Sequence, residues 1–123
     1  MKKILGIGNA LVDILVQLPN DETLSKLELP KGSMQLIDES MMHRISDSTN
    51  LLTHYTATGG SASNTSVALA RLGCKVGFIG KVGHDNLGSF YADDLNNNNI
   101  TPHLLKSDLP SGRCNVLISN DSE

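Results

Sequence analysis

Hydrophobic and polar residues follow two different spacings along this chain, and each spacing predicts a different kind of element. Apolar residues alternate with polar ones along residues 12–18 and 113–119, which is typical of half-exposed β-strands. Continuous apolar runs predict buried strands. These runs cover residues 3–8 and 75–80, and shorter strands are expected at residues 34–37, 55–58 and 101–105. Almost nothing separates the first two strands, so we expect a strand that bends sharply and continues in a second sheet.

Helical spacing and capping residues predict four helices. They cover residues 22–27, 39 to about 52, 65–72 and 86 to about 95. Asn20 or Asp21, Asp38 and Asp85 are suitable N-caps, and Gly73 is a natural residue after a helix end. The alternation of strands and helices from residue 55 to 105 predicts right-handed βαβ units in a parallel sheet. The alternating segments near residues 12–18 and 113–119 predict a half-exposed antiparallel sheet beside it.

Length and composition narrow the class of protein. A chain of 123 residues with 39% hydrophobic residues fits one globular domain. Aromatic residues make up only 3%, which argues against stacking on single-stranded nucleic acid. The net charge is −3 and no basic cluster exceeds Lys2-Lys3, so we expect neither a nucleic-acid nor a membrane partner. No signal peptide or apolar span is recognisable, and a cytoplasmic location is expected.

Cysteine and histidine spacing gives no metal site. Cys74 and Cys114 show neither a metal-binding spacing nor a disulfide framework, and the four histidines share no ligand spacing. A reducing compartment and no metal ligand are therefore expected. The segment Gly6-Ile7-Gly8 is only a weak dinucleotide signal, because Leu11 stands where the third glycine would be.

The most informative segment is residues 59–64, which read G-G-S-A-S-N and lead directly into an apolar helix. Two adjacent glycines permit positive φ and let a ligand lie against bare backbone. The helix directs its free N–H groups and the positive end of its dipole at that turn. A pocket for a small polyhydroxylated or anionic molecule is one interpretation, and a tight strand–helix turn is the other.

Three polar side chains near this turn are candidate ligands of such a molecule. Asp13 is a carboxylate on an otherwise apolar strand, and it can accept two hydrogen bonds from vicinal hydroxyls. A solvent-facing strand residue is the alternative. Asn64 either satisfies the helix N-terminus or binds a hydroxyl, and Asn9 either shapes a turn or lines the same pocket.

These residues resemble the ribokinase (PfkB) type of carbohydrate and nucleoside kinases. The first signature of that family is matched at seven places, Gly59, Gly60, Ala62, Asn64, Ser66, Gly73 and Gly83. Residues 80–88 look like its G-x-V-G-x-D-x-x-G segment, and residues 8–14 look like its opening strand motif. Residues 31–38 are similar to the adenosine-kinase-like branch. The resemblance covers essentially all 123 residues.

The resemblance implies a ribokinase-like α/β fold, a doubly wound and mostly parallel sheet with a small β-sheet lid. Lid strands are expected near residues 11–18, 33–37 and 113–119. Family members are more than twice this length, and their second signature, G-A-G-D, supplies the general base and the anion hole. This chain contains no G-A-G-D, so residues 1–123 resemble the N-terminal, substrate-binding part, and the chain end looks like a cut. No catalytic residue is therefore expected here.

The resemblance also implies roles for single residues. Asp13 matches the aspartate that holds substrate hydroxyls, Gly59 and Gly60 would lie against the sugar, and Asn64 would reach a hydroxyl. Asn9, Met34 and Cys114 would line the same pocket or its lid. Ser111-Gly112 partly follows the family's Thr-Gly, with Ser in place of Thr, which leaves a substrate contact there open. Asp85 is interpreted as a helix cap.

The expected function is ATP-dependent phosphorylation of a sugar or nucleoside hydroxyl, this chain supplying the acceptor-binding half. ATP and Mg²⁺ would bind in the full-length enzyme, through residues outside this chain. A non-catalytic sugar- or nucleoside-binding module is the alternative. Half of a doubly wound sheet leaves an unpaired edge and an exposed apolar face. We therefore expect a homodimer or aggregate through the lid strands or the sheet edge.

Overall fold

The computed structural model describes residues 2–122, and the chain forms two compact units. The first unit comprises the chain up to Asp13 together with Thr56–Cys114. The second comprises Ile14–Tyr55 and the chain from Asn115 onward. Each unit has its own apolar cluster.

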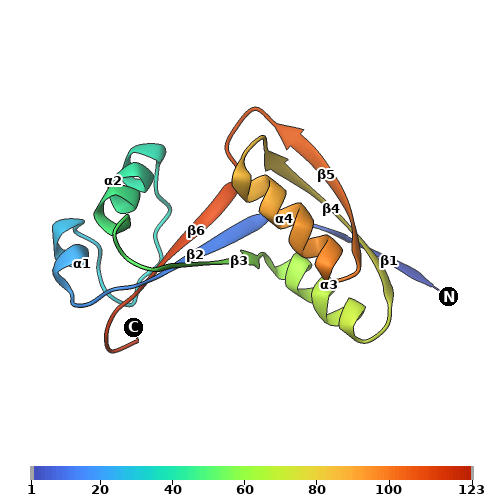
Figure 1. Cartoon of the computed structure of the whole chain (residues 1–123), viewed down its shortest axis with the longest axis horizontal. Coiled ribbons are helices and arrows are strands. Elements are labelled where there is room, and N and C mark those ends of the chain that lie inside the picture. Colours follow the sequence, from blue (N-terminus) through green and yellow to red (C-terminus); the bar gives the residue numbers. More distant parts are fainter. Residues whose placement is uncertain (1, 123) are drawn as a thin grey trace. The chain divides into compact units, whose positions relative to one another are not determined.

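A three-stranded parallel sheet forms the centre of the first unit (Figure 1). Its order is β1-β4-β5, with β1 at Lys3–Ile7, β4 at Lys75–Gly83 and β5 at Ile100–Ser107. Helix α3 (Ser61–Arg71) precedes β4, and helix α4 (Asn86–Asn97) connects β4 to β5. Parallel strands need such crossovers, because a short hairpin cannot return the chain to the same end of the sheet. The α/β class and the parallel sheet are confirmed.

Both helices of this unit pack on one face of the sheet. Phe78 of β4, Tyr91 and Leu95 of α4 and Ile100 of β5 are fully or almost fully buried in that core. The opposite face is open in this chain, since Leu5 and Ile7 of β1 are 56% and 69% exposed. The prediction that residues 3–8 form a fully buried strand is therefore wrong for this chain: helices cover only the face that carries Ile4.

The second sheet has the order β3-β2-β6, with β3 at His54–Gly59, β2 at Leu11–Gln17 and β6 at Gly112–Ile118. The chain passes from β1 into β2 and so changes sheet, as the short spacing between them predicted. The strand at residues 55–58 was expected in the parallel sheet, but β3 belongs to this second sheet instead. One apolar strand cannot reveal its partner, because pairing is decided by tertiary packing.

The expected antiparallel arrangement of the second sheet is wrong for β2 and β6. Gly112 approaches Leu11, with 2.9 Å between an added Cβ and Leu11 Cδ2. Further along, the Leu18 N–H donates to the Ile118 carbonyl at 2.8 Å. The two strands therefore advance together, as parallel neighbours do.

The expected strand at residues 33–37 is absent, and this part of the second unit is irregular. Gly32 takes a positive φ of 73° and the Ser33 hydroxyl donates to the Pro30 carbonyl, so a turn leads into the segment. Met34 is 92% exposed and Leu36 is fully exposed. Apolar side chains in a segment of this length cannot stabilise an isolated strand without a partner.

Two helices complete the second unit, α1 at Glu22–Lys26 and α2 at Glu39–Thr49. Asp38 caps α2 as predicted, because its side chain accepts from the Met41 N–H at 2.8 Å. The helix ends at Thr49, before the predicted residue 52, and Ile45 and Thr49 are its buried residues. A small apolar cluster of Val16, Leu18 and Leu24 holds this unit together.

Candidate functional site

The carboxylate of Asp13 lies directly against the backbone of Gly59. Asp13 is a partly buried residue of β2, and Gly59 is the buried last residue of the adjacent strand β3. A Cβ added to Gly59 would lie 2.8 Å from Asp13 Oδ1 and 2.9 Å from Oδ2. Real side-chain carbons do not approach oxygens so closely. Only glycine therefore allows this carboxylate to occupy its place, and the interpretation of Asp13 as a purely solvent-facing residue is wrong.

Gly60 forms the corner between β3 and α3. Its φ is +97°, a value that residues with a side chain rarely adopt. A Cβ there would also meet the backbone carbonyl of Asn9 at 2.6 Å. Gly60 is the N-cap of α3 and brings no side-chain hydrogen bond to the first turn. The first N–H groups of α3 are thus left without a side-chain acceptor from the cap, at the end of the helix where the dipole is positive.

Helix α3 begins four residues earlier than the sequence predicted, at Ser61. Asn64 consequently lies within the first turn, with its backbone N–H bonded to the Gly60 carbonyl at 2.9 Å and its side chain exposed. Asn9 is also exposed, beside the corner that its carbonyl helps to form. Asn9, Asp13, Gly59, Gly60 and Asn64 therefore gather around the β3–α3 corner, and their ligand roles stay predictions.

Cys114 lies on β6, the other neighbour of β2, and is partly buried. Burial raises the pKa of the Cys114 thiol, and the negative charge of Asp13 raises it further. Gly112 of β6 lies against Leu11 of β2, so Cys114 and Asp13, two residues further along each strand, lie close together. A neutral thiol beside an ionised carboxylate offers a weak donor and a soft, apolar surface to a ligand. Met34 belongs to the second unit and stays a prediction.

Asp85 does more than cap α4. Its Oδ1 accepts from the Gly88 N–H at 2.8 Å, as predicted for a cap, and also from the Ser111 hydroxyl at 2.6 Å. Its Oδ2 accepts from the Ser111 N–H at 2.8 Å. The hydrogen bonds from Ser111 and Gly88, with the nearby charge of Lys106, lower the pKa of Asp85, and burial opposes this.

Ser111 is buried in this network, since it also accepts from the Gly83 N–H at 2.8 Å. The hydroxyl is therefore committed to Asp85 and Gly83. It closes the loop before β6, and a substrate contact by this side chain is not available without breaking the network.

Sequence reasoning missed three residues that support the corner. The Thr58 hydroxyl donates to Asp94 Oδ2 of α4 at 2.7 Å, and the Tyr91 hydroxyl donates to the Gly59 carbonyl at 3.4 Å. Burial raises the pKa of Tyr91, the nearby Ser63 hydroxyl opposes this, and the charge of Asp94 adds to the rise. Ser63 Oγ lies near the Tyr91 hydroxyl, but it has no hydrogen-bond partner within residues 2–122. No local sequence signal connects positions more than thirty apart.

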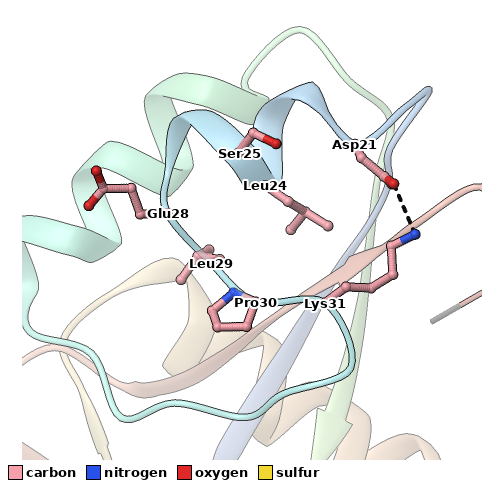
Figure 2. A pocket seen from close by; sticks show the side chains of 7 residues that line it. All are labelled: Asp21, Leu24, Ser25, Glu28, Leu29, Pro30 and Lys31. Atoms are coloured by element: carbon pink, nitrogen blue, oxygen red, sulfur yellow. Dashed lines mark ion pairs between the residues drawn. The ribbon is translucent and has the colours of Figure 1, made fainter.

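A separate hollow of about 380 Å³ lies within the second unit, lined by seven residues of α1 and the loop that follows it (Figure 2). Lys31 forms ion pairs there with Asp21 at 2.9 Å and Asp121 at 3.0 Å. Hydrogen bonds to these two carboxylates raise the pKa of Lys31. Its charge is thus already neutralised, and none of the predicted site residues lines this hollow.

Residues 2–122 contain no group of three or more His, Cys, Asp or Glu side chains that could hold a metal ion. Within the same residues, no helix is long and apolar enough to cross a bilayer.

A protein-family model matches the part of the chain that contains the paired glycines and the start of α3. The model of the pfkB family of carbohydrate kinases matches residues 33–123. The chain belongs to the pfkB family. The predicted resemblance is thereby confirmed, and the α/β architecture with a second sheet is the one expected for this family.

Similar proteins of the pfkB family include both sugar kinases and nucleoside kinases. Over 70 residues the chain is 40% identical to a 5-dehydro-2-deoxygluconokinase of Geobacillus thermodenitrificans, covering 56% of this chain and 20% of that protein. The structure of adenosine kinase from Sinorhizobium meliloti matches with 30% identity and a TM-score of 0.76, covering 97% of this chain and 36% of that one. Trypanosoma brucei brucei adenosine kinase shares the fold with a TM-score of 0.84 at 22% identity, over 97% and 38% of the two chains.

This pfkB-family chain therefore spans about a fifth of the curated relative and just over a third of the solved kinases. The matched third includes the β3–α3 corner, β2 and β6.

Proposed function

We propose that this chain is the acceptor-binding part of a kinase that transfers the γ-phosphoryl group of ATP to a hydroxyl of a sugar or nucleoside. The family match and the kinase relatives support the reaction class. The observation that carries the acceptor site is the Asp13 carboxylate held against Gly59. Asp13 would accept hydrogen bonds from two vicinal hydroxyls, and the bare backbone of Gly59 and Gly60 would let the ring approach closely.

An acceptor at this corner would meet a consistent set of groups. The carboxylate is partly buried and so interacts more strongly with hydroxyl donors than it would in bulk water. Asn64, exposed in the first turn of α3, can donate to or accept from a further hydroxyl. Asn9 and Cys114 are proposed to line the same pocket, and all of these residues lie in the first unit.

In the proposed reaction the acceptor oxygen forms a bond to the γ-phosphorus, and the bond from that phosphorus to the β–γ bridging oxygen breaks. ADP leaves with that electron pair, and the hydroxyl proton passes to a base outside this chain. The residues described here act by positioning, which supplies much of the rate in phosphoryl transfer. Mg²⁺ would bind with the ATP phosphates, apart from the acceptor-holding residues described here. We therefore assign no metal step to them.

The comparisons support two classes of acceptor. The sequence relatives include a 5-dehydro-2-deoxygluconokinase, and the solved structures at 30% identity include an adenosine kinase. Both names imply a polyhydroxylated acceptor, and a carboxylate that holds a diol suits either. The similarity of residues 31–38 to the adenosine-kinase-like branch favours adenosine or a related ribose compound in our proposal.

The test uses the full-length protein that contains this chain. Calorimetric titration with adenosine, ribose, fructose and 5-dehydro-2-deoxygluconate should give one tight ligand, and ADP release should then depend on that ligand. Asp13→Asn keeps the shape but removes the charge, and we expect it to weaken binding on the order of 10- to 100-fold. An unchanged affinity in Asp13→Asn would remove the diol role. Tight binding without ADP release would support a non-catalytic binding module instead.

A further inference from the structure

The end of strand β3 is tied to helix α4 by a side-chain hydrogen bond. The first four residues of β3, from His54, are exposed, and only Thr58 and Gly59 are covered. At that covered end, the Thr58 hydroxyl donates to Asp94 Oδ2 of α4 at 2.7 Å. A bond of this length to an ionised acceptor is among the stronger kinds of hydrogen bond. It fixes the residue immediately before the glycine pair.

Asp94 is itself oriented by its own helix. The Asn98 side-chain amide donates to the Asp94 carbonyl at 2.8 Å and approaches Asp94 Oδ2 at 3.5 Å. One turn earlier, Tyr91 is fully buried and its ring packs against Phe78, with 6.1 Å between centroids. Residues three apart share one face of a helix, so Tyr91 anchors the same face of α4 that presents Asp94. The Tyr91 hydroxyl also makes a long, 3.4 Å hydrogen bond to the Gly59 carbonyl.

We propose that Asp94 is a positioning residue for the acceptor site. It accepts the hydrogen bond of the Thr58 hydroxyl, and this contact keeps the Gly59 backbone against the Asp13 carboxylate. The two groups lie so close that a Cβ added to Gly59 would be 2.8 Å from Asp13 Oδ1. Asp94 touches neither Asp13 nor the glycines through any hydrogen bond within residues 2–122, so its effect passes through Thr58. The inference rests on the proposed acceptor role of Asp13. It goes beyond that role by making the affinity for the acceptor depend on a helix outside the pocket.

A contact between α4 and β3 that positions the acceptor site has different effects from a contact that only stabilises the fold. A structural tie would change the free energy of unfolding and leave the binding of acceptor by the folded protein unchanged. A positioning contact changes the affinity for the acceptor because the Asp13–Gly59 geometry loosens in the folded state. A group that binds substrate and transition state equally well affects KM and leaves kcat unchanged. The split between the two constants therefore distinguishes the roles.

The experiment measures kcat and KM in the full-length protein, with the acceptor identified by the titration above. Thr58→Val keeps the shape and removes the hydroxyl, and Thr58→Ser restores a hydroxyl. We expect Thr58→Val and Asp94→Ala to raise KM for the acceptor about three- to tenfold, with kcat changed less than about twofold. KM for ATP should stay constant. Thr58→Ser keeps a hydroxyl donor and Asp94→Asn keeps an acceptor oxygen, so the hydrogen bond can still form in each variant. Both should return KM to within about twofold of the wild type.

Asp93→Ala is the matched control, because Asp93 is the neighbouring carboxylate on α4 and is exposed. It should leave every constant unchanged. If Asp94→Ala fails to fold, the Thr58→Val and Thr58→Ser pair decides the question. An unchanged acceptor KM in Thr58→Val, alongside a raised KM in Asp13→Asn, overturns the role of Asp94 and leaves the proposed function intact. If Asp13→Asn also binds acceptor normally, the proposed acceptor role of Asp13 is wrong, and the inference about Asp94 falls with it.

Discussion

Replacing Gly59 by alanine tests the contact on which the acceptor site depends. The new Cβ would lie 2.8 Å from Asp13 Oδ1, 2.9 Å from Oδ2 and 3.0 Å from Cγ. Non-bonded atoms of this kind need roughly 3.5 Å, so the carboxylate must withdraw by about 0.7 Å. The backbone conformation of Gly59 is not of the left-handed kind, since Gly59 is absent from the residues with positive φ. The perturbation therefore acts on the carboxylate and not on the chain.

The expected loss of acceptor affinity in Gly59→Ala follows from the size of that displacement. A hydrogen bond to a charged group contributes about 1.5–3 kcal/mol, which is on the order of 10- to 100-fold in Kd. A misplacement of about 1 Å in an active site lowers the rate roughly 100-fold. The estimate from the displacement therefore agrees with the estimate from the hydrogen-bond energy. Stability should change by less than about 2 kcal/mol, because the Asp13 side chain can rotate away and alanine restricts the unfolded chain.

Calorimetric titration of the full-length protein with its acceptor, together with thermal unfolding, measures both quantities. Two further glycines serve as controls. Gly60→Ala meets the Asn9 carbonyl at 2.6 Å and has a φ of +97°, so it should lose both stability and binding. Gly73→Ala has a φ of +90° but meets no atom within 4 Å, so it should cost about 1–3 kcal/mol of stability without affecting the acceptor. Acceptor affinity in Gly59→Ala equal to that of the wild type would refute the reasoning.

Three further predictions concern ionisation and self-association. The pKa of Asp85 is lowered in the folded state, so its stabilisation is present above the unfolded value of 3.8 and is lost as pH falls through the folded value. In urea unfolding, Asp85→Asn should therefore be less stable than the wild type by about 1 kcal/mol at pH 7, and the difference should shrink as the pH falls below 3.8; a constant difference would contradict this. The Cys114 thiol should react slowly with a disulfide reagent at pH 8 in a Cys74→Ser background, and Asp13→Asn should accelerate it because the carboxylate raises the thiol pKa; equal rates would show that Asp13 does not act on Cys114. The isolated 123-residue chain should self-associate through its open sheet face, so light scattering should give a mass above 13.2 kDa that Ile7→Lys lowers, and a monomeric mass at high concentration would refute it.

Local signals in the sequence determined most of the individual elements. Apolar runs located β1 and β4, and alternation located β2 and β6, because side-chain spacing reports directly on the repeat of the backbone. The caps Asp38 and Asp85 and the helix end at Gly73 were also predictable, since each depends on neighbours within four residues. The glycine pair and the following helix identified the family, and the resemblance predicted a role for Asp13.

Tertiary structure alone decided how those elements pair and which groups meet. It placed β3 in the second sheet, made β2 and β6 parallel and left residues 33–37 without a strand, because a strand's partner lies far away in sequence. It also brought the Asp13 carboxylate onto Gly59, 46 positions later in the sequence, and bonded Thr58 to Asp94. The physical reason is the same throughout. Spacing within a segment reports the repeat of its own backbone, whereas a contact between segments exists only after the chain has packed.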